Sequence, residues 1–161
     1  MKKVVIIGNG IAGITAARHI RKRSNCAISV ISSESPYFFS RTALMYVYMG
    51  HLTFEHTKPY EDHFWKKNRI DLIFDHAESL NTENKHIVLK SGRTISYDQL
   101  VIATGSRSNR LNVPGVELDG VQTLYSCDDL DQMTRNTLDV RSAVVIGGGL
   151  IGVEMAEMLR S

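Results

Sequence analysis

The stretch that decides the fold is Val4-Val5-Ile6-Ile7-Gly8-Asn9-Gly10-Ile11-Ala12-Gly13. An unbroken run of β-branched residues is typical of a parallel strand that is buried on both faces. The three glycines that follow have the spacing G-x-G-x-x-G. In this pattern the first glycine permits the turn from strand to helix and the second lets a pyrophosphate approach the backbone. The third allows the helix to pack closely on the strand, so these ten residues predict a dinucleotide-binding turn.

The residues after this turn complete a βαβ unit. Apolar side chains recur at roughly helical spacing up to Ser24-Asn25, and residues 28–31 predict the next strand. Phosphate oxygens would lie at the helix N-terminus, where unpaired N–H groups favour negative charge. Glu34, at the end of the second strand, is placed to accept hydrogen bonds from ribose hydroxyls. The alternative is a glycine-rich turn without a ligand. The helix positions expected to pack on the sheet are Ile11, Ala12, Ala16, Ala17 and Ile20.

The rest of the chain predicts further helices and strands, with a second glycine turn near the end. Gly147, Gly149 and Gly152 repeat the spacing after an apolar run at 143–146. Two such turns argue for two nucleotides, one of which passes electrons to the other, although a duplicated sheet element without a ligand is the alternative. The other expected elements are helices near 42–49, 60–68, 126–138 and 153–160, strands at 70–74 and 100–103, a hairpin of 86–90 with 94–97, and a linker at 106–125.

Composition narrows the class of protein. The chain has 161 residues, 43% of them apolar and 22% charged, which is ordinary for a globular chain and excludes disorder, collagen and a disulfide scaffold. A net charge of +2 with only a short basic run at 21–23 gives little support for a nucleic-acid partner. No apolar span predicts a transmembrane helix, and the run at 4–7 is too short for a secretory signal, so we expect a cytoplasmic protein.

Three segments together resemble the two-dinucleotide flavoprotein (pyridine nucleotide-disulfide oxidoreductase) superfamily, and its ferredoxin-reductase and NADH-oxidase members in particular. They are the opening turn at 4–13, Tyr97-Asp98-Gln99-Leu100-Val101-Ile102-Ala103-Thr104-Gly105, and Val145-Ile146-Gly147-Gly148-Gly149-Leu150-Ile151-Gly152-Val153-Glu154-Met155-Ala156. The resemblance implies an α/β fold: a Rossmann-like FAD-binding domain (1–110) with a parallel sheet and a small antiparallel β-meander, followed by the incomplete start of an NAD(P)-binding domain (111–161). It also implies that the chain is the N-terminal portion of a longer reductase.

The resemblance assigns cofactors to the two turns. It implies FAD at the first and NAD(P)H at the second, with Arg41 able to reach a phosphate. A solvated arginine at a helix start is the equal alternative for Arg41. In some relatives the acid that matches Glu154 pairs with a lysine, but Tyr46 stands near that place here. The cofactor-binding residues so implied are Gly8, Gly10, Ile11, Ala12, Gly13, Glu34, Arg41, Thr104 and Gly105 for FAD, and Gly147, Gly149, Gly152 and Glu154 for NAD(P)H.

The expected chemistry is hydride transfer from NAD(P)H to flavin, and then electron transfer to an acceptor that the sequence does not name. Disulfide reductases of the family carry a cysteine pair after the first βαβ unit, but residues 35–49 contain no cysteine, so Cys26 and Cys127 are interpreted as structural thiols. Hydride transfer needs no acid–base side chain, so we predict no catalytic residue and no metal ligand. Alternatives are a type-II NADH:quinone dehydrogenase and a non-catalytic nucleotide-binding module. The resemblance also allows a homodimer.

Overall fold

The computed structural model describes residues 1–160, which form two compact units. One unit comprises residues 1–39 together with 58–106, and the other comprises residues 40–57 together with the chain from 107 onward. The division into domains at residue 110 remains a prediction. No helix in the described part of the chain is both long enough and apolar enough to cross a membrane.

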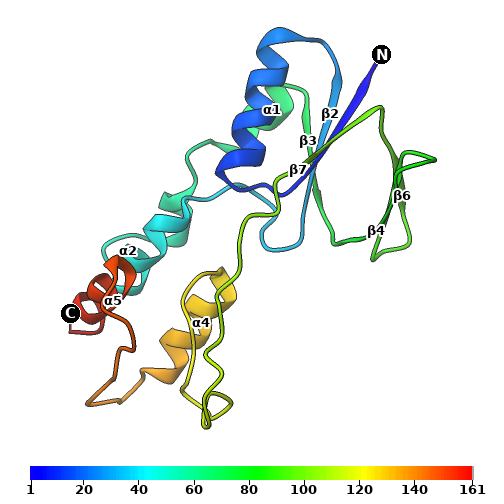
Figure 1. The fold of residues 1–161 in the computed structure, drawn as a ribbon. Helices are drawn as coiled ribbons and strands as arrows, with labels where there is room; N and C mark the ends of the chain where they lie inside the picture. The colour runs from blue at the N-terminus through cyan, green and yellow to red at the C-terminus, as the bar shows by residue number, and fades with distance from the viewer. Residues whose placement is uncertain (161) are drawn as a thin grey trace. The chain divides into compact units, whose positions relative to one another are not determined.

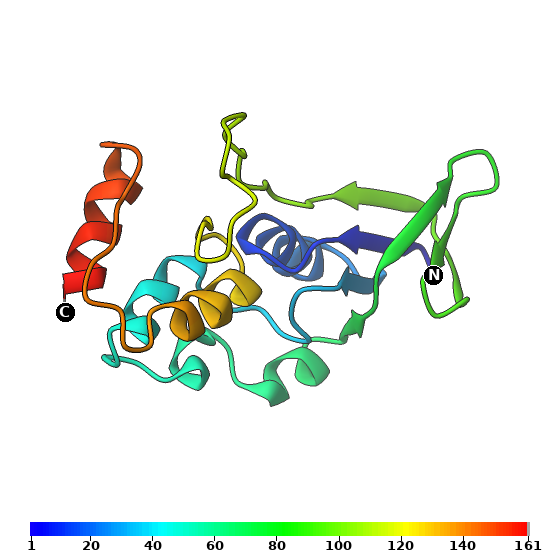
Figure 2. The same cartoon turned by 90° about the horizontal axis from the view of Figure 1, so that it is seen from below.

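A four-stranded parallel sheet forms the centre of the first unit. Its strands are β1 (Lys3–Ile7), β2 (Ala27–Ser32), β3 (Ile70–Phe74) and β7 (Gln99–Ile102), in the order β3-β2-β1-β7. Figure 2 shows β1 and β7 running side by side in the same direction. All four predicted strands of this sheet are present, and α1 (Ile11–Arg23) makes the crossover from β1 to β2. The predicted α/β fold with a parallel sheet is confirmed.

The two faces of this sheet bury alternate residues of each strand, as the period of two requires. Val4 and Ile6 of β1 face α1, which lies along the sheet in Figure 1, whereas Val5 faces the smaller sheet. The α1 side also contains the aromatic residues Phe38 and Trp65. The core on the α1 side is formed by Val4, Ile6, Ile14, Ala17, Ile28, Val30, Phe38, Trp65 and Ile70, and the core on the other side by Val5, Ile31, Ile73, Ile87, Leu89 and Tyr97.

A small antiparallel sheet covers the second face. It consists of β4 (Ala77–Asn81), β5 (His86–Leu89) and β6 (Thr94–Ser96). The hairpin of β5 and β6 is confirmed. We did not predict β4, because its sequence Ala-Glu-Ser-Leu-Asn lacks β-branched residues. In the structure most of this strand is exposed. Pairing with β5 makes it a strand, so this element depends on its neighbour more than on its own residues.

Short helices are present in both units. The first unit contains α3 (Asp62–Lys67), and the second contains a 3₁₀ turn, Arg41–Ala43, that continues into α2 (Leu44–Tyr48), and another at Phe54–Thr57. The helix predicted near 42–49 is therefore present as a 3₁₀ turn followed by α2, and the helix predicted near 60–68 is present but shorter.

The second unit also contains α4 (Cys127–Asn136) and α5 (Leu150–Arg160), both of which were predicted. At the start of α4, Ser126 Oγ accepts a hydrogen bond from the Asp129 backbone N–H (3.1 Å). The Asp129 carboxylate accepts one from the Ser126 backbone N–H (2.9 Å). This capping box explains why the helix begins where the sequence Ser-Cys-Asp-Asp placed it.

The predicted strand at 143–146 is not formed. These residues have no regular secondary structure, and Val144 and Ile146 are 88% and 76% exposed. A parallel strand is stabilised by hydrogen bonds to a neighbouring strand, and none of the described residues pairs with this segment. The apolar run therefore stays unpaired and irregular, which corrects the prediction.

Candidate dinucleotide-binding site

The first glycine turn lies at the carboxyl end of β1, and its backbone requires glycine. Gly8 has φ of +108°, a region that L side chains rarely adopt. A Cβ at this position would lie 2.1 Å from the backbone oxygen of Ala103, the residue that follows β7. Gly8 N–H also donates to the Ile31 carbonyl of β2 (2.8 Å). The turn is therefore held directly against the strands on either side of β1.

The other two glycines of the turn have opposite surroundings. A Cβ on Gly13 would lie 1.9 Å from the Gly8 carbonyl oxygen, so the close packing of α1 on the turn depends on the missing side chain. A Cβ on Gly10 would meet nothing within 4 Å. The space above Gly10 is open, which is what the close approach of a pyrophosphate to the backbone requires. The residues present thus fit the phosphates of a dinucleotide.

The N-terminus of α1 presents its backbone donors to this open space. Gly10 is the N-cap in an extended conformation, and no side chain caps the helix. Ile11 is 72% exposed and Ala12 is also exposed, which corrects the prediction that they pack on the sheet. The predicted Ala17 does pack there, together with Ile14, which was not predicted. An uncapped helix N-terminus leaves N–H groups and the positive end of the dipole available to an anion.

Two further predicted segments reach the same edge of the sheet, because the carboxyl ends of parallel strands lie together. Ala103 N–H donates to the Ile7 carbonyl (2.8 Å), and the exposed Thr104 and Gly105 follow, with Gly105 at φ of +74°. Glu34 lies two residues beyond the end of β2 and is exposed. The structure thus places Gly8, Glu34 and Thr104 after three adjacent strands.

Asn9 is a residue of this site that the sequence analysis did not identify. It is 7% exposed, and its Nδ2 donates to the carbonyl oxygens of Ser35 (2.8 Å) and Tyr37 (3.1 Å). The motif allows any residue between its first two glycines, so the pattern carries no signal for this position. The only hint is the amide itself, which can donate two hydrogen bonds from one atom.

Arg41 belongs to the second unit, where its guanidinium contacts Tyr125. Nη1 donates to the Tyr125 carbonyl, and the guanidinium carbon lies 4.4 Å from the centre of the Tyr125 ring. This arrangement is a cation–π contact combined with a backbone hydrogen bond. The phosphate-binding role of Arg41 remains a prediction.

The second glycine turn repeats the local geometry of the first. Gly147 has φ of +121°, a Cβ on Gly149 would meet nothing within 4 Å, and a Cβ on Gly152 would lie 1.9 Å from the Gly147 carbonyl oxygen. Glu154, the fifth residue of α5, is half-buried. Unlike Gly8, Gly147 has no neighbouring strand within 4 Å of its missing Cβ. At this position the positive φ favours glycine, but no close backbone neighbour requires it.

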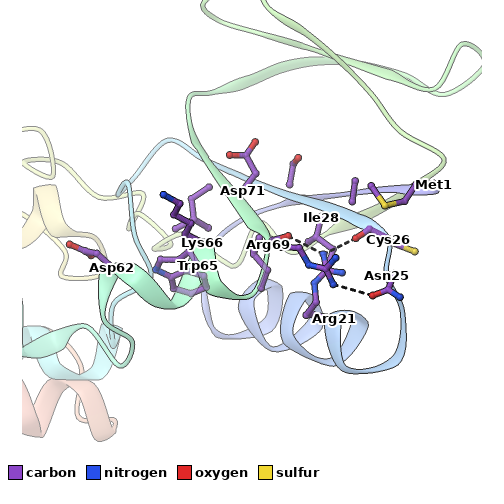
Figure 3. Close-up of a pocket in the computed structure, with 14 residues that line it drawn as sticks. Met1, Arg21, Asn25, Cys26, Ile28, Asp62, Trp65, Lys66, Arg69 and Asp71 are labelled. Carbon is purple, nitrogen blue, oxygen red and sulfur yellow. Dashed lines mark hydrogen bonds between the residues drawn. The ribbon is translucent and has the colours of Figure 1, made fainter.

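A pocket of about 710 Å³ lies elsewhere in the first unit, where β2 and β3 begin. Figure 3 shows Arg21, Arg69 and Lys66 among the residues that line it. Ligands of parallel α/β sheets bind at the opposite edge, where strands end. Arg21 is also already engaged, because its guanidinium donates to four backbone carbonyls. These belong to Asn68 (2.7 Å), Ser24 (3.2 Å), Cys26 (2.7 Å) and Arg69 (2.9 Å). We therefore interpret this network as structural.

Cys26 and Cys127 are not joined in a disulfide, and both are partly buried. Among residues 1–160, no three His, Cys, Asp or Glu side chains gather in a way that could hold a metal ion.

Comparison with known proteins identifies one family over almost the whole chain. The model of the family described as pyridine nucleotide-disulphide oxidoreductase matches residues 2–161. The ferredoxin reductase component of a chlorobenzene dioxygenase from a Cupriavidus species is 37% identical over 160 residues, which are 98% of this chain and 39% of that protein. The NADH-rubredoxin oxidoreductase of Clostridium acetobutylicum is 32% identical over 158 residues, which are 98% of this chain and 41% of that protein.

Solved structures agree with this result. A ferredoxin reductase from Rhodopseudomonas palustris superimposes with a TM-score of 0.90 and 31% identity, over 99% of this chain and 40% of that one. The crystal structure of the Clostridium acetobutylicum NADH:rubredoxin oxidoreductase gives a TM-score of 0.87 and 32% identity, over 99% of this chain and 42% of that one. The chain thus spans about 40% of the length of each of these proteins.

Proposed function

The chain belongs to the pyridine nucleotide-disulphide oxidoreductase family, and from that premise we propose that it is the nucleotide-binding part of a reductase that passes electrons from NAD(P)H through FAD to a protein acceptor. The observation that carries the proposal is the first glycine turn. Gly8 and Gly13 are packed too tightly for any side chain, whereas the space above Gly10 is open at an uncapped helix N-terminus. The names of the relatives support a small redox protein, such as a ferredoxin or a rubredoxin, as the acceptor.

In this proposal the first unit binds the ADP half of FAD. The backbone N–H groups of Ile11, Ala12 and Gly13 hold the pyrophosphate, and Glu34 accepts hydrogen bonds from the ribose hydroxyls. Thr104 and Gly105 line the same edge of the sheet. When bound, the flavin supplies the chemistry by accepting a hydride equivalent and releasing electrons to the acceptor. The protein's part is to bind and orient the two nucleotides and to exclude water.

The second glycine turn is proposed to bind the pyrophosphate of NAD(P)H. Gly149 has the same open surroundings as Gly10, and Glu154 lies on the helix that follows. On this proposal the FAD-binding part covers residues 1–110, and the start of the nicotinamide-binding part lies within 111–161. Because the chain spans about 40% of its relatives, we expect it to bind nucleotides but to show little NAD(P)H oxidation by itself.

The test measures ADP binding by calorimetry and FAD retention by the visible spectrum after desalting. We expect the chain to bind ADP. Gly10→Ala places a methyl group where the pyrophosphate approaches. It should weaken ADP binding at least about tenfold. Gly149→Ala is the matched control, because it makes the same change at the other turn and should leave high-affinity ADP binding at the first turn intact.

Two results would contradict the proposed first site. One is a wild-type chain that binds neither ADP nor FAD, and the other is an equal loss of ADP affinity in Gly10→Ala and Gly149→Ala. A yellow chain that keeps one flavin through desalting would extend the proposal from the ADP half to the whole cofactor.

A further inference from the structure

The loop that follows β2 is fixed to the first glycine turn by a single side chain. Asn9 is almost fully buried, and its Nδ2 reaches two carbonyl oxygens that lie 26 and 28 positions further along the chain, those of Ser35 and Tyr37. The residue between these two acceptors is Pro36. Asn9 therefore connects the centre of the glycine turn to the loop that begins with Glu34.

Only an amide side chain of this length satisfies both acceptors from one atom. Carbonyl oxygens accept and do not donate, so the side chain must present NH₂ to them. A carboxylate at position 9 has the same shape but would place negative oxygen against both carbonyls. An apolar residue would leave the buried Ser35 carbonyl and the partly buried Tyr37 carbonyl without these donors, which is costly in the interior.

These contacts place Glu34 between two anchored backbone segments. On its N-terminal side, the Ser32 carbonyl at the end of β2 accepts a hydrogen bond from Asp75 N–H (2.9 Å). On its C-terminal side, the buried Ser35 is held by Asn9. The backbone of Glu34 is thus defined relative to both β2 and the glycine turn, while its side chain remains exposed.

We propose that Asn9 is a positioning residue for ribose recognition. It holds the Ser35–Tyr37 backbone so that the Glu34 carboxylate is directed to the ribose of a nucleotide whose phosphates lie on the Gly8–Gly13 turn. The inference rests on the proposed function of that turn and adds a determinant of specificity for the ribose hydroxyls. Asn9 acts through Glu34 and has no contact with the nucleotide in this scheme.

A general structural role and a positioning role predict different binding patterns. If Asn9 only stabilised the fold, its substitution would weaken the binding of every ligand of the turn to the same extent. If it positions Glu34, the loss would be confined to ligands that have ribose hydroxyls. The probes are therefore ADP and 2′,3′-dideoxy-ADP, which share the base and phosphates and differ only in those hydroxyls.

The test compares Asn9→Asp, Glu34→Gln and the double variant by calorimetry at a temperature where each is folded. We expect Asn9→Asp and Glu34→Gln each to lower the ratio of ADP affinity to 2′,3′-dideoxy-ADP affinity about tenfold, since hydrogen bonds to charged groups are typically worth that much. The charge added by Asn9→Asp acts on the phosphates of both probes and cancels in this ratio. In the double variant, the second substitution should cause little further loss in this ratio. Asn9→Ala removes the donors without adding charge, carries the same expectation, and replaces Asn9→Asp if the latter does not fold.

Asn68→Asp is the matched control. Asn68 Nδ2 donates to the Phe64 carbonyl (2.8 Å) at the end of α3, so the same chemical change removes an amide-to-carbonyl bond in the same unit. This variant should lower the midpoint of thermal unfolding while leaving the ratio of ADP affinity to 2′,3′-dideoxy-ADP affinity unchanged.

The outcomes separate this inference from the proposed function. If the wild-type chain binds neither probe, the proposed function of the turn is wrong. If the wild-type chain binds both probes equally well, the ribose-binding role of Glu34 in the proposed function is wrong together with the inference. If Asn9→Asp weakens the binding of both probes to the same extent while Glu34→Gln weakens only that of ADP, the inference alone is wrong.

Discussion

At the scale of single residues, the two glycines that follow Asn9 make different demands on the fold. Gly10 lies in the ordinary extended region, with φ of −70°, and has open space where a side chain would begin. Gly13 is inside α1, and the space beside it is filled by the Gly8 carbonyl oxygen. The sequence motif requires both glycines. The structure shows that Gly13 is needed for packing, whereas Gly10 leaves open the space that the proposed ligand would occupy.

This difference predicts the effect of alanine on stability. We expect Gly13→Ala to lower the free energy of unfolding by about 3 kcal/mol, because α1 must move away from the turn to admit the methyl group. Gly10→Ala should change it by less than about 1 kcal/mol, since only the N-cap preference is altered. Urea unfolding followed by circular dichroism measures both. Similar values for the two variants would contradict the assignment of their roles.

Asp75 makes the stability of the fold depend on pH. A hydrogen bond from the Ser91 side chain, together with those from the backbone of His76 and Ser91 and the charge of Arg93, lowers the pKa of its carboxyl below the usual value, against a smaller opposing effect of desolvation. A carboxyl whose pKa is lower in the folded state stabilises the fold above its unfolded pKa of 3.8. That contribution is lost as the pH falls through the lower, folded value.

We therefore expect Asp75→Asn to flatten the acid side of the stability profile. The variant should be less stable than wild type at pH 6, and the difference should shrink as the pH falls below 3.8. Urea midpoints measured at several pH values between 6 and 2.5 test this. A difference that stays constant over the range would show that the carboxyl does not titrate differently in the folded state.

At the scale of elements, the end of α1 is joined to the turn after α3 by Arg21. Its guanidinium donates to carbonyls on both sides of this junction, those of Ser24 and Cys26 and those of Asn68 and Arg69. The planar fork of arginine can serve several carbonyls at once, whereas a lysine ammonium on a flexible stem cannot reproduce that geometry. The network fixes where α1 ends relative to the start of β2 and β3.

Arg21→Lys should lower the free energy of unfolding by about 2 kcal/mol, since it keeps the charge but loses most of these bonds. Arg23→Lys is the control, because Arg23 is exposed in the last turn of the same helix and the substitution makes the same chemical change. Chemical denaturation of the two variants measures the difference. Equal stability of the two would contradict a structural role for the Arg21 network.

The helices and strands also show which elements can be read from sequence. Local patterns predicted β1, α1, β2, β3 and β7 within one or two residues, because each has its own apolar period or glycine boundary. They missed β4, and they wrongly predicted a strand at 143–146. In both cases the deciding factor is a partner strand: β4 has β5, and no described residue pairs with 143–146.

At the scale of the whole molecule, the site depends on three strands that are far apart in sequence. The parallel order β3-β2-β1-β7 brings Glu34 and Thr104 to the edge where the glycine turn lies. The family resemblance had already assigned these residues to one cofactor, and the sheet order now supplies the geometric reason. Their roles in binding remain predictions that the nucleotide titrations address.

The sequence by itself determined the βαβ unit, the two glycine turns and the membership of the family, because each motif on which they depend lies within about a dozen consecutive positions. Only the tertiary structure decided that Asn9 holds the Ser35 carbonyl, that Arg21 holds the Asn68 carbonyl, and that Ile14 rather than Ile11 packs on the sheet. The physical reason is that a hydrogen bond or a packed surface needs both partners in place. A pattern in one segment cannot show which distant backbone atom the fold brings beside it.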